Sequence, residues 1–329
     1  MKPESIFPIL LMTALTSFAA WEPLPNLPVP NGGFVCGQLG GKIVVLGGTT
    51  WKDNTKHWLD EIWVFDPNTQ KWESRGRLPN PLALGVSGEW KGDLIFAGGT
   101  DGQQPRHEVW RMTHSFELKK VGELKKDSAL ATGGVVENDL IILGGCADVT
   151  KLDGLHKGGE KFHLQKASGS DLLAAGNLAF GMAASATIGN ELFIFGGVVH
   201  DPVTQVANLS DAWAFDLRKN RWRSLRPFPH AVRGPTAVRL DSRRILIAGG
   251  YGGAADTFSA AAFVYDTRKD TYARTMDLPI AAVVGLVQAG DFVYCLGGED
   301  KMKHRTDLCF RMRVDKLVGS ARNRAEKPR

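Results

Sequence analysis

The chain has 329 residues, of which 43% are hydrophobic, so it can bury a large core. Its 38 glycines favour many tight turns over long helices. The formal net charge is +5, but the basic residues form no stripe interleaved with aromatic side chains, so we expect no nucleic-acid partner. The eight histidines and four cysteines show no metal-ligand spacing, and we expect no metal and no cofactor.

Residues 1–19 resemble a secretory signal peptide. Lys2 supplies a weak positive charge, residues 6–18 are mostly apolar, and Ser17 and Ala19 place small side chains before a cut. We predict cleavage after Ala19 and a periplasmic or secreted protein. An apolar N-terminal strand or a retained anchor is the alternative. The apolar run is too short to cross a membrane comfortably, and no later segment approaches that length, so we expect no membrane span.

Six glycine pairs divide residues 20–314 into repeats of about 50 residues. Each pair ends a short apolar run such as KIVVLGG or DLIILGG, which reads as a buried strand. The pairs begin at Gly47, Gly98, Gly144, Gly196, Gly249 and Gly297. This period is typical of kelch-type β-propeller blades. We therefore predict an all-β fold, a six-bladed kelch-type β-propeller.

Each repeat accommodates four strands. The glycine-pair strand is the second, and a third strand follows that is aromatic and ends in Asp in the clearest repeats, as in WVFD before Pro67. An outer strand then opens with Trp72, Trp222 or Tyr272, and a Leu-Pro or Phe-Pro step follows it. Proline is tolerated at such an edge, where a missing N–H costs little.

The two ends of the chain are predicted to share one blade. Trp21, followed by Leu27 and Pro28, repeats the outer-strand signature before the first repeat. The last repeat stops after its third strand, at residues 308–314, and lacks an outer strand. We expect the Trp21 segment to complete the last blade and to close the ring, which removes open sheet edges.

Residues 315–329 carry five basic side chains after the last strand, and we expect a solvated, frayed basic tail. Attraction of an anionic ligand or surface is the alternative. Cys295 and Cys309 fall in neighbouring strands of the last blade. Isolated buried thiols are the favoured state, but the sequence leaves a disulfide between them open.

The loops that enter the inner strands and the loops that follow the glycine pairs should share one end of the channel. The residues directly after the pairs should therefore surround its mouth. They are Thr49, Thr100, Cys146, Val198, Tyr251 and Glu299. Glu299 is the only carboxylate among them, which makes it a candidate proton-transfer group.

Arg305 follows Glu299 by six residues, just before the third strand of the last blade. Its guanidinium could bind the carboxylate of an acidic sugar. A structural ion pair that only pins a long loop is the alternative reading. His304 lies beside this pair, and Arg233 enters the fifth inner strand on the same face, so both are candidate substrate-binding residues.

Within kelch-type propellers, this sequence resembles the sialic acid mutarotases, or N-acetylneuraminate epimerases, and their cyclically permuted relatives. The resemblance in the catalytic loop covers about fourteen residues: Gly298-Glu299, Lys301, Arg305-Thr306-Asp307 and Phe310. It implies an exported bacterial six-bladed propeller in which Glu299 transfers protons and Arg305 is essential. The motif lies in the last blade, as a circular permutation would place it, and no inter-blade loop is long enough for the helical insertion of the best-studied type.

We therefore predict a mutarotase that interconverts the anomers of sialic acid or a related acidic sugar by acid–base ring opening and closure. The alternative is a non-catalytic kelch propeller that binds a protein or a glycan on the same loop face. A small acidic sugar is the expected partner, and the sequence leaves a homodimer open.

Overall fold

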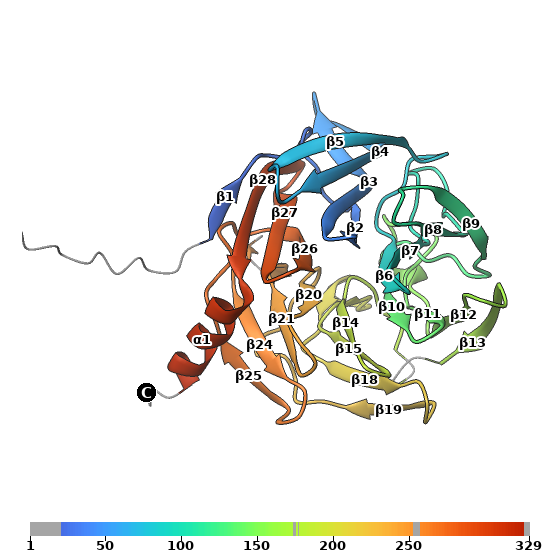
Figure 1. The fold of residues 1–329 in the computed structure, drawn as a ribbon. Coiled ribbons are helices and arrows are strands. Elements are labelled where there is room, and N and C mark those ends of the chain that lie inside the picture. The colour runs from blue at the N-terminus through green and yellow to red at the C-terminus, as the bar shows by residue number, and fades with distance from the viewer. Residues whose placement is uncertain (1–20, 174–175, 177, 253–256, 326–329) are drawn as a thin grey trace, which may run out of the picture.

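The computed structural model describes residues 21–173, 176, 178–252 and 257–325. The predicted signal peptide, residues 1–19, lies outside the described residues, so its cleavage stays a prediction. Figure 1 shows the described chain as a ring of sheets around a central axis.

Six four-stranded antiparallel sheets form the ring, which confirms the predicted six-bladed β-propeller. In each blade the strands are named from the axis outward. Blade one contains β2 (Val35–Leu39), β3 (Lys42–Lys52), β4 (Thr55–Asp66) and β5 (Lys71–Arg77), and blade two contains β6 (Val86–Trp90), β7 (Asp93–Ala97), β8 (Glu108–Met112) and β9 (Leu118–Glu123). Blade three contains β10 (Thr132–Val136), β11 (Asp139–Leu143), β12 (Gly159–His163) and β13 (Ser168–Leu172), and blade four contains β14 (Ala184–Ile188), β15 (Glu191–Phe195), β18 (Ala212–Asp216) and β19 (Arg221–Ser224). Blade five contains β20 (Thr236–Arg239), β21 (Arg244–Ala248), β24 (Ala262–Asp266) and β25 (Thr271–Arg274), and blade six contains β26 (Val283–Ala289), β27 (Phe292–Lys301), β28 (His304–Arg313) and β1 (Glu22–Leu24).

Short elements extend or connect these blades. Two-stranded ribbons extend blades four and five, formed by β16 (Val198–Val199) with β17 (Ala207–Asn208) and by β22 (Tyr251–Gly252) with β23 (Thr257–Phe258). A 3-10 turn, η1 (Leu152–Gly154), lies in the long connection of blade three.

The glycine pairs are required by the close approach of neighbouring blades. Gly47 and Gly48 have φ values of 59° and 103°, which disfavour any residue with a Cβ. A Cβ on Gly47 would lie 2.1 Å from the carbonyl oxygen of Leu82, which accepts a hydrogen bond from the Gly48 amide. The pair thus lets the end of each second strand bond to the chain entering the next blade.

The hydrophobic core lies between the blades rather than at the axis. One cluster joins Val44 and Leu46 of blade one to Phe96 and Met112 of blade two, all buried. Both faces of each sheet are covered in this way, so the second strands read as continuous apolar runs. The aromatic residues that open the outer strands anchor the edges, as Trp72 does by packing on Phe65 at 5.1 Å and donating to the Pro25 carbonyl.

The N-terminal segment completes blade six, as predicted. β1 pairs antiparallel with β28, with Glu22 opposite Arg311 and Leu24 opposite Cys309. Trp21 Nε1 donates a 2.8 Å hydrogen bond to the Asp277 carbonyl of blade five. In Figure 1, β1 therefore lies at the outer edge of the blade that contains the last strand of the chain.

The segment expected to be a frayed tail is different in the structure. Residues Val314–Ala325 form a helix, α1, which lies against blade five in Figure 1. Leu317, Val318 and Ala321 are buried in the cluster between blades five and six. Thr275 Oγ1 also donates to the Leu317 carbonyl at 2.6 Å. These three apolar residues fall on one helical stripe, and their burial holds the helix against the blades.

The cysteines of blade six are free thiols in the structure. Cys295 lies in the cluster facing blade five and Cys309 in the cluster facing blade one, so the two side chains lie on opposite faces of the sheet. Burial raises the pKa of the Cys309 thiol to about 12. The sequence left a disulfide between the two cysteines open, and the structure shows none. Side chains of neighbouring residues along a strand alternate between the two faces of the sheet, and this alternation keeps the two thiols apart.

No helix among the described residues is both long enough and apolar enough to cross a membrane.

Replacing the buried Leu24 of β1 tests the ring closure. We expect Leu24→Ala to lower the free energy of unfolding by about 2–5 kcal/mol, because it leaves a cavity at the closing strand. Chemical denaturation measures this. The control is Glu22→Gln in the same strand, whose exposed 2.8 Å ion pair with Arg311 should contribute at most about 1 kcal/mol. Equal stability of the two variants would contradict a closing role for β1.

Candidate active site

The residues after the glycine pairs occupy equivalent positions at one end of the channel. Each is paired through the backbone with a residue that enters the inner strand of the same blade. The pairs are Gly32–Thr49, Ala83–Thr100, Ala129–Cys146, Gly181–Val198, Arg233–Tyr251 and Val283–Glu299. We call this set the mouth positions. Among them, only Arg233 and Glu299 carry a charge at neutral pH, and they belong to neighbouring blades.

The residue after the glycine pair has a second neighbour, on the segment that leads into the third strand of the same blade. In blades one, two, four and five this neighbour is Trp58, Pro105, Asn208 and Phe258, respectively. In blade six the corresponding residue is Arg305. The blades are therefore similar at these positions, except for blades five and six, where Arg233, Glu299 and Arg305 introduce charges.

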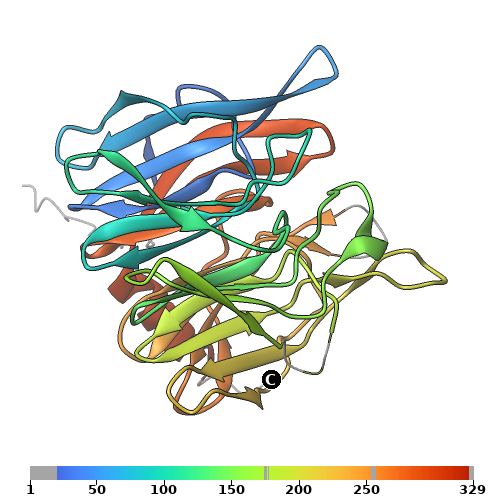
Figure 2. The ribbon, with the colours of Figure 1, turned by 90° about the vertical axis from the view of Figure 1, so that its right-hand side faces the viewer.

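Glu299 and Arg305 lie on paired strands rather than on a loop. We expected Arg305 before the third strand, but β28 already begins at His304 and pairs with β27, with Lys301 opposite His304. The hairpin therefore extends past the ring, and an irregular register between Gly298 and Lys301 places Glu299 beside Arg305. Arg305 Nη1 and Glu299 Oε1 are 3.1 Å apart. In Figure 2 this hairpin, in orange-red, and the blue β3–β4 hairpin both extend to the right.

Arg305 is buried, although its guanidinium carries a charge. Its side chain is 7% exposed, against 35% for Glu299. Nε donates to Thr49 Oγ1 at 3.2 Å, and Nη1 donates to the His304 carbonyl at 2.9 Å. A Cβ on Gly32 would lie 2.5 Å from Arg305 Cδ, so only glycine leaves room for this side chain. Arg305 thus holds Glu299 in place from the junction of blades six and one.

Arg233 supplies a guanidinium that no carboxylate neutralises among the described residues. Its charged group lies 4.3 Å from the centre of the Tyr251 ring, and Nη1 donates to Asn208 Oδ1 at 3.3 Å. A Cβ on the next residue, Gly234, would lie 3.2 Å from a methyl group of Val283, the blade-six residue that pairs with Glu299. Arg233 therefore enters blade five at the mouth, and its guanidinium lies between Tyr251 of blade five and Asn208 of blade four.

His304 is not brought to Glu299 by any contact in the described chain. Its Nδ1 lies 2.5 Å from Asp300 Oδ1, and its side chain is 54% exposed. The structure therefore brings Glu299 and Arg305 into direct contact, whereas the Arg233 guanidinium lies at the junction of blades four and five and His304 pairs with Asp300 at the hairpin.

Lys56 is a member of this site that the sequence analysis did not identify. It lies on β4, on the hairpin of blade one that neighbours the β27–β28 hairpin. Burial of its amine lowers its pKa, the nearby Arg305 guanidinium lowers that pKa further, and the Glu299 carboxylate raises it. No motif could have indicated it, because Lys56 and Arg305 are 249 residues apart in sequence and meet only when the ring closes.

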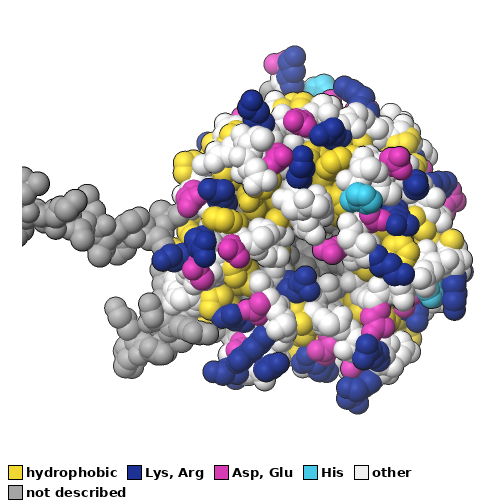
Figure 3. All heavy atoms as spheres, in the orientation of Figure 1, with side chains coloured by type: hydrophobic (Ala, Val, Ile, Leu, Met, Phe, Trp, Pro, Cys, Tyr) yellow, Lys and Arg dark blue, Asp and Glu magenta, His cyan; other side chains and the backbone are white. Residues whose placement is uncertain are grey.

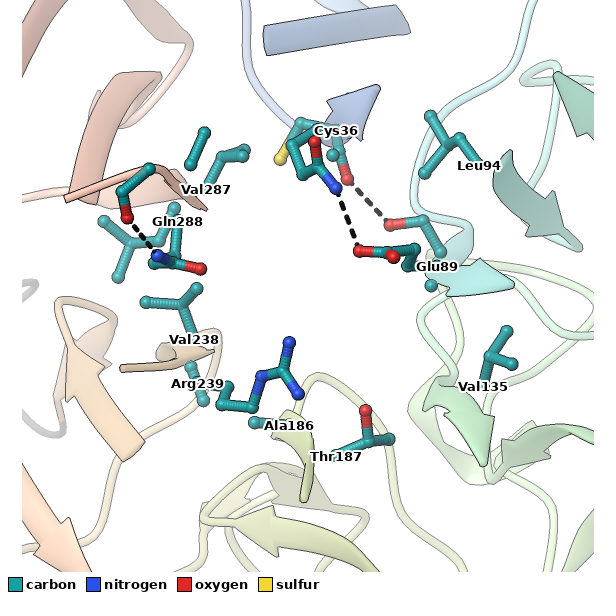
Figure 4. A pocket seen from close by; sticks show the side chains of 18 of the residues that line it. Cys36, Glu89, Leu94, Val135, Ala186, Thr187, Val238, Arg239, Val287 and Gln288 are labelled. Atoms are coloured by element: carbon teal, nitrogen blue, oxygen red, sulfur yellow. Dashed lines mark hydrogen bonds between the residues drawn. The ribbon is translucent and has the colours of Figure 1, made fainter. Parts of the chain in front are cut away.

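A cavity of about 510 Å³ opens at the opposite end of the channel, away from these groups. Figure 3 shows this face, which is hollowed near its centre. Glu89 and Arg239 reach into the cavity from different blades (Figure 4), and Glu89 accepts a 2.9 Å hydrogen bond from Gln38. Much of the remaining lining comes from small or apolar residues of the inner strands, such as Gly37, Ala186 and Val287. We place the candidate chemistry at the charged mouth because several polar groups converge there in fixed geometry.

Within the described ranges, no three His, Cys, Asp or Glu side chains are arranged to hold a metal ion.

A substitution at Gly32 tests the packing of Arg305. We expect Gly32→Ala to lower the free energy of unfolding by about 1–3 kcal/mol, because its methyl group displaces a buried guanidinium stem. Thermal or chemical denaturation measures the effect. Gly154→Ala is the matched control, since a Cβ there would have nothing within 4 Å. If both variants are equally stable, Arg305 is not confined by Gly32.

Comparison with known proteins identifies the repeats. Residues 30–79 and 179–229 match the Kelch motif, which corresponds to most of blades one and four. The chain is 22% identical over 289 residues to spermatocyte protein spe-26 of Caenorhabditis elegans, covering 84% of this chain and 40% of that protein. It is 33% identical over 109 residues to the Kelch repeat-containing protein At3g27220 of Arabidopsis thaliana, covering 29% of this chain and 26% of that protein.

The chain is also similar to N-acetylneuraminate epimerase of Salmonella typhimurium, with 25% identity over 169 residues. That match covers 40% of this chain and 44% of the epimerase. The matches thus span less than half the length of each of these relatives. Together with the blades, they identify a six-bladed kelch-type propeller that resembles N-acetylneuraminate epimerase.

Proposed function

We propose that this protein is a mutarotase that interconverts the anomers of N-acetylneuraminate or a related acidic sugar. The observation that carries the proposal is the concentration of charge at the mouth, where Glu299, Arg305 and Arg233 stand at positions that are uncharged in the other blades. The similarity to N-acetylneuraminate epimerase supports the choice of substrate. An exported location, periplasmic or secreted, is part of the proposal and rests on residues 1–19.

Mutarotation requires proton transfer at two oxygen atoms. A base removes the proton of the anomeric hydroxyl while an acid protonates the ring oxygen, and the bond between the anomeric carbon and the ring oxygen breaks. The open-chain carbonyl then rotates and the ring closes on its other face, with both protons returned. Glu299 is the proposed base, because its carboxylate is one-third exposed and is held by Arg305 at 3.1 Å.

The two arginines have different proposed roles. Arg305 already uses Nε and Nη1 within the protein and is buried, so its main role is to position Glu299. Nη2 of Arg305 has no hydrogen-bond partner among the described residues and could add one contact to the substrate. Arg233, which stacks on Tyr251 and lacks an ion pair within the described chain, is the proposed site for the sugar carboxylate.

A non-catalytic propeller that binds a protein or a glycan on the same face is the second candidate. It is favoured by the similarity to spe-26, which extends over 84% of this chain, more than twice the share matched by the epimerase. The fold alone does not discriminate between the two candidates, because propellers carry both functions. The kinetics of the Glu299 variant discriminate between them.

Glu299→Gln removes proton transfer while keeping the shape of the side chain. We expect it to slow anomer exchange on N-acetylneuraminate by about a hundred- to ten-thousand-fold, with binding largely retained. NMR exchange spectroscopy measures the rate. Glu61→Gln is the matched control, because Glu61 also pairs with an arginine, Arg77, at 3.1 Å but lies toward the outer strand. A parent protein that does not accelerate exchange would favour the binding module instead.

Arg233→Gln tests the carboxylate contact. Loss of a charge-assisted hydrogen bond of about 1.5–3 kcal/mol should weaken the binding of N-acetylneuraminate by about ten- to a hundred-fold. Calorimetric titration with the acid and with its methyl ester separates charge from shape, and only the acid should bind less tightly to the variant. Equal losses for acid and ester would assign Arg233 a structural role.

A further inference from the structure

Lys56 lies where blade one meets the Glu299–Arg305 pair. Arg305 Nε donates to Thr49 Oγ1 across the junction, and Thr49 pairs with Trp58 in the β3–β4 hairpin. Lys56 precedes Trp58 by two residues, so both side chains belong to the same face of β4. The amine is close enough for the charges of both members of the pair to act on its pKa, although it comes from another blade.

The position of the amine is set by an aromatic ring. Lys56 Nζ lies 4.3 Å from the centre of the Trp58 ring, within the range of a cation–π contact. Trp58 is confined in turn, since a Cβ on Gly102 of blade two would lie 2.1 Å from its Nε1. A lysine that is free to rotate would lose this position, whereas a lysine resting on a fixed indole keeps its amine near the mouth.

The charged groups around Lys56 come from both hairpins. The charges of Glu299 on β27 and Arg305 on β28 act on its pKa from across the junction, and Lys303 of the same hairpin lies over Trp51 at 5.8 Å. On its own hairpin, the neighbouring Lys52 and His57 are exposed. No carboxylate forms an ion pair with Lys56 in the described part of the chain. The amine is thus half-buried, held on a ring and without a fixed counter-ion.

Ring opening requires an acid as well as a base, and the proposed function has so far assigned only the base. We propose that Lys56 is the acid: its ammonium gives a proton to the ring oxygen of the sugar while Glu299 takes the proton of the anomeric hydroxyl. The bond between the anomeric carbon and the ring oxygen breaks, which leaves a neutral amine, a protonated Glu299 and the open-chain carbonyl. Closure on the other face returns both protons. This inference rests on the proposed mutarotase function.

The electrostatic environment of Lys56 suits this role. Burial and Arg305 lower its pKa from the ordinary value, so the ammonium is a stronger acid than that of an exposed lysine. The protonated form is then lost at a lower pH than for an ordinary lysine. Activity that depends on this form should therefore fall on the alkaline side before free lysines titrate.

Two substitutions separate proton transfer from charge. We expect Lys56→Met, which keeps much of the aliphatic stem, to slow anomer exchange by about a hundred- to ten-thousand-fold. Lys56→Arg keeps the positive charge but holds its proton too tightly to release it, so it should be slowed as well. The alkaline fall of the rate should be present in the parent protein and absent from Lys56→Met. Lys52→Met, an exposed site on the same hairpin, is the matched control and should exchange at the parent rate.

The outcomes distinguish this inference from the function on which it rests. If the parent does not accelerate exchange, the mutarotase proposal and this inference both fail. If Glu299→Gln is slow but Lys56→Arg retains the parent rate, Lys56 contributes only charge and this inference alone fails. Should Lys56→Met not fold, NMR titration of the Lys56 amine in the intact protein replaces it. A pKa below the ordinary lysine value is expected there, and an ordinary value would overturn the inference.

Discussion

The antiparallel pairing of β1 with β28 is the interaction on which the rest of the structure depends. A propeller blade buries both sheet faces only if it has a neighbour on each side, so an open ring would expose apolar faces at two blades. The closing strand is only three residues long. It supplies the outer strand of blade six, whose other three strands come from the C-terminal part of the chain. The pairing adds to the contacts between blades six and one, which also include the hydrogen bond from the Gly298 amide to the Asn31 carbonyl.

The candidate site is assembled across the same junction. Arg305 of blade six bonds to Thr49 of blade one and fits over Gly32, which leads into the first inner strand. Lys56 reaches the pair from the hairpin of blade one. Closure of the ring therefore serves both the stability of the fold and the assembly of the candidate site, since it brings together side chains from the two ends of the sequence.

Near-symmetry of the blades explains why a few residues stand out. Most of the mouth positions are small or apolar, which suits strands that converge on an axis. A buried guanidinium at such a position needs several partners to offset its desolvation. Arg305 obtains them from Glu299, Thr49 and the His304 carbonyl. Arg233 obtains less, an aromatic face and one amide oxygen, which leaves its charge available to a ligand.

The sequence by itself determined the repeat, the number of blades and the shared last blade. The reason is local: a glycine pair at each close inter-blade contact and an aromatic at the outer strands of the clearest repeats are visible one repeat at a time. It also indicated Glu299, as the one carboxylate directly after a glycine pair, Arg305, which follows it in the family's motif, and Arg233, which enters the fifth inner strand on the same face.

Only the tertiary structure decided how these residues are used. The burial of Arg305 depends on Gly32 and Thr49 of blade one, and the separation of His304 from Glu299 depends on its pairing with Asp300. Lys56 rests on Trp58 within blade one and comes near Arg305 and Glu299 only at the junction with blade six. The docking of α1 likewise depends on an apolar surface formed by blades five and six. No local sequence pattern predicts contacts between residues that are far apart in the chain, because the two partners meet only when the ring has closed.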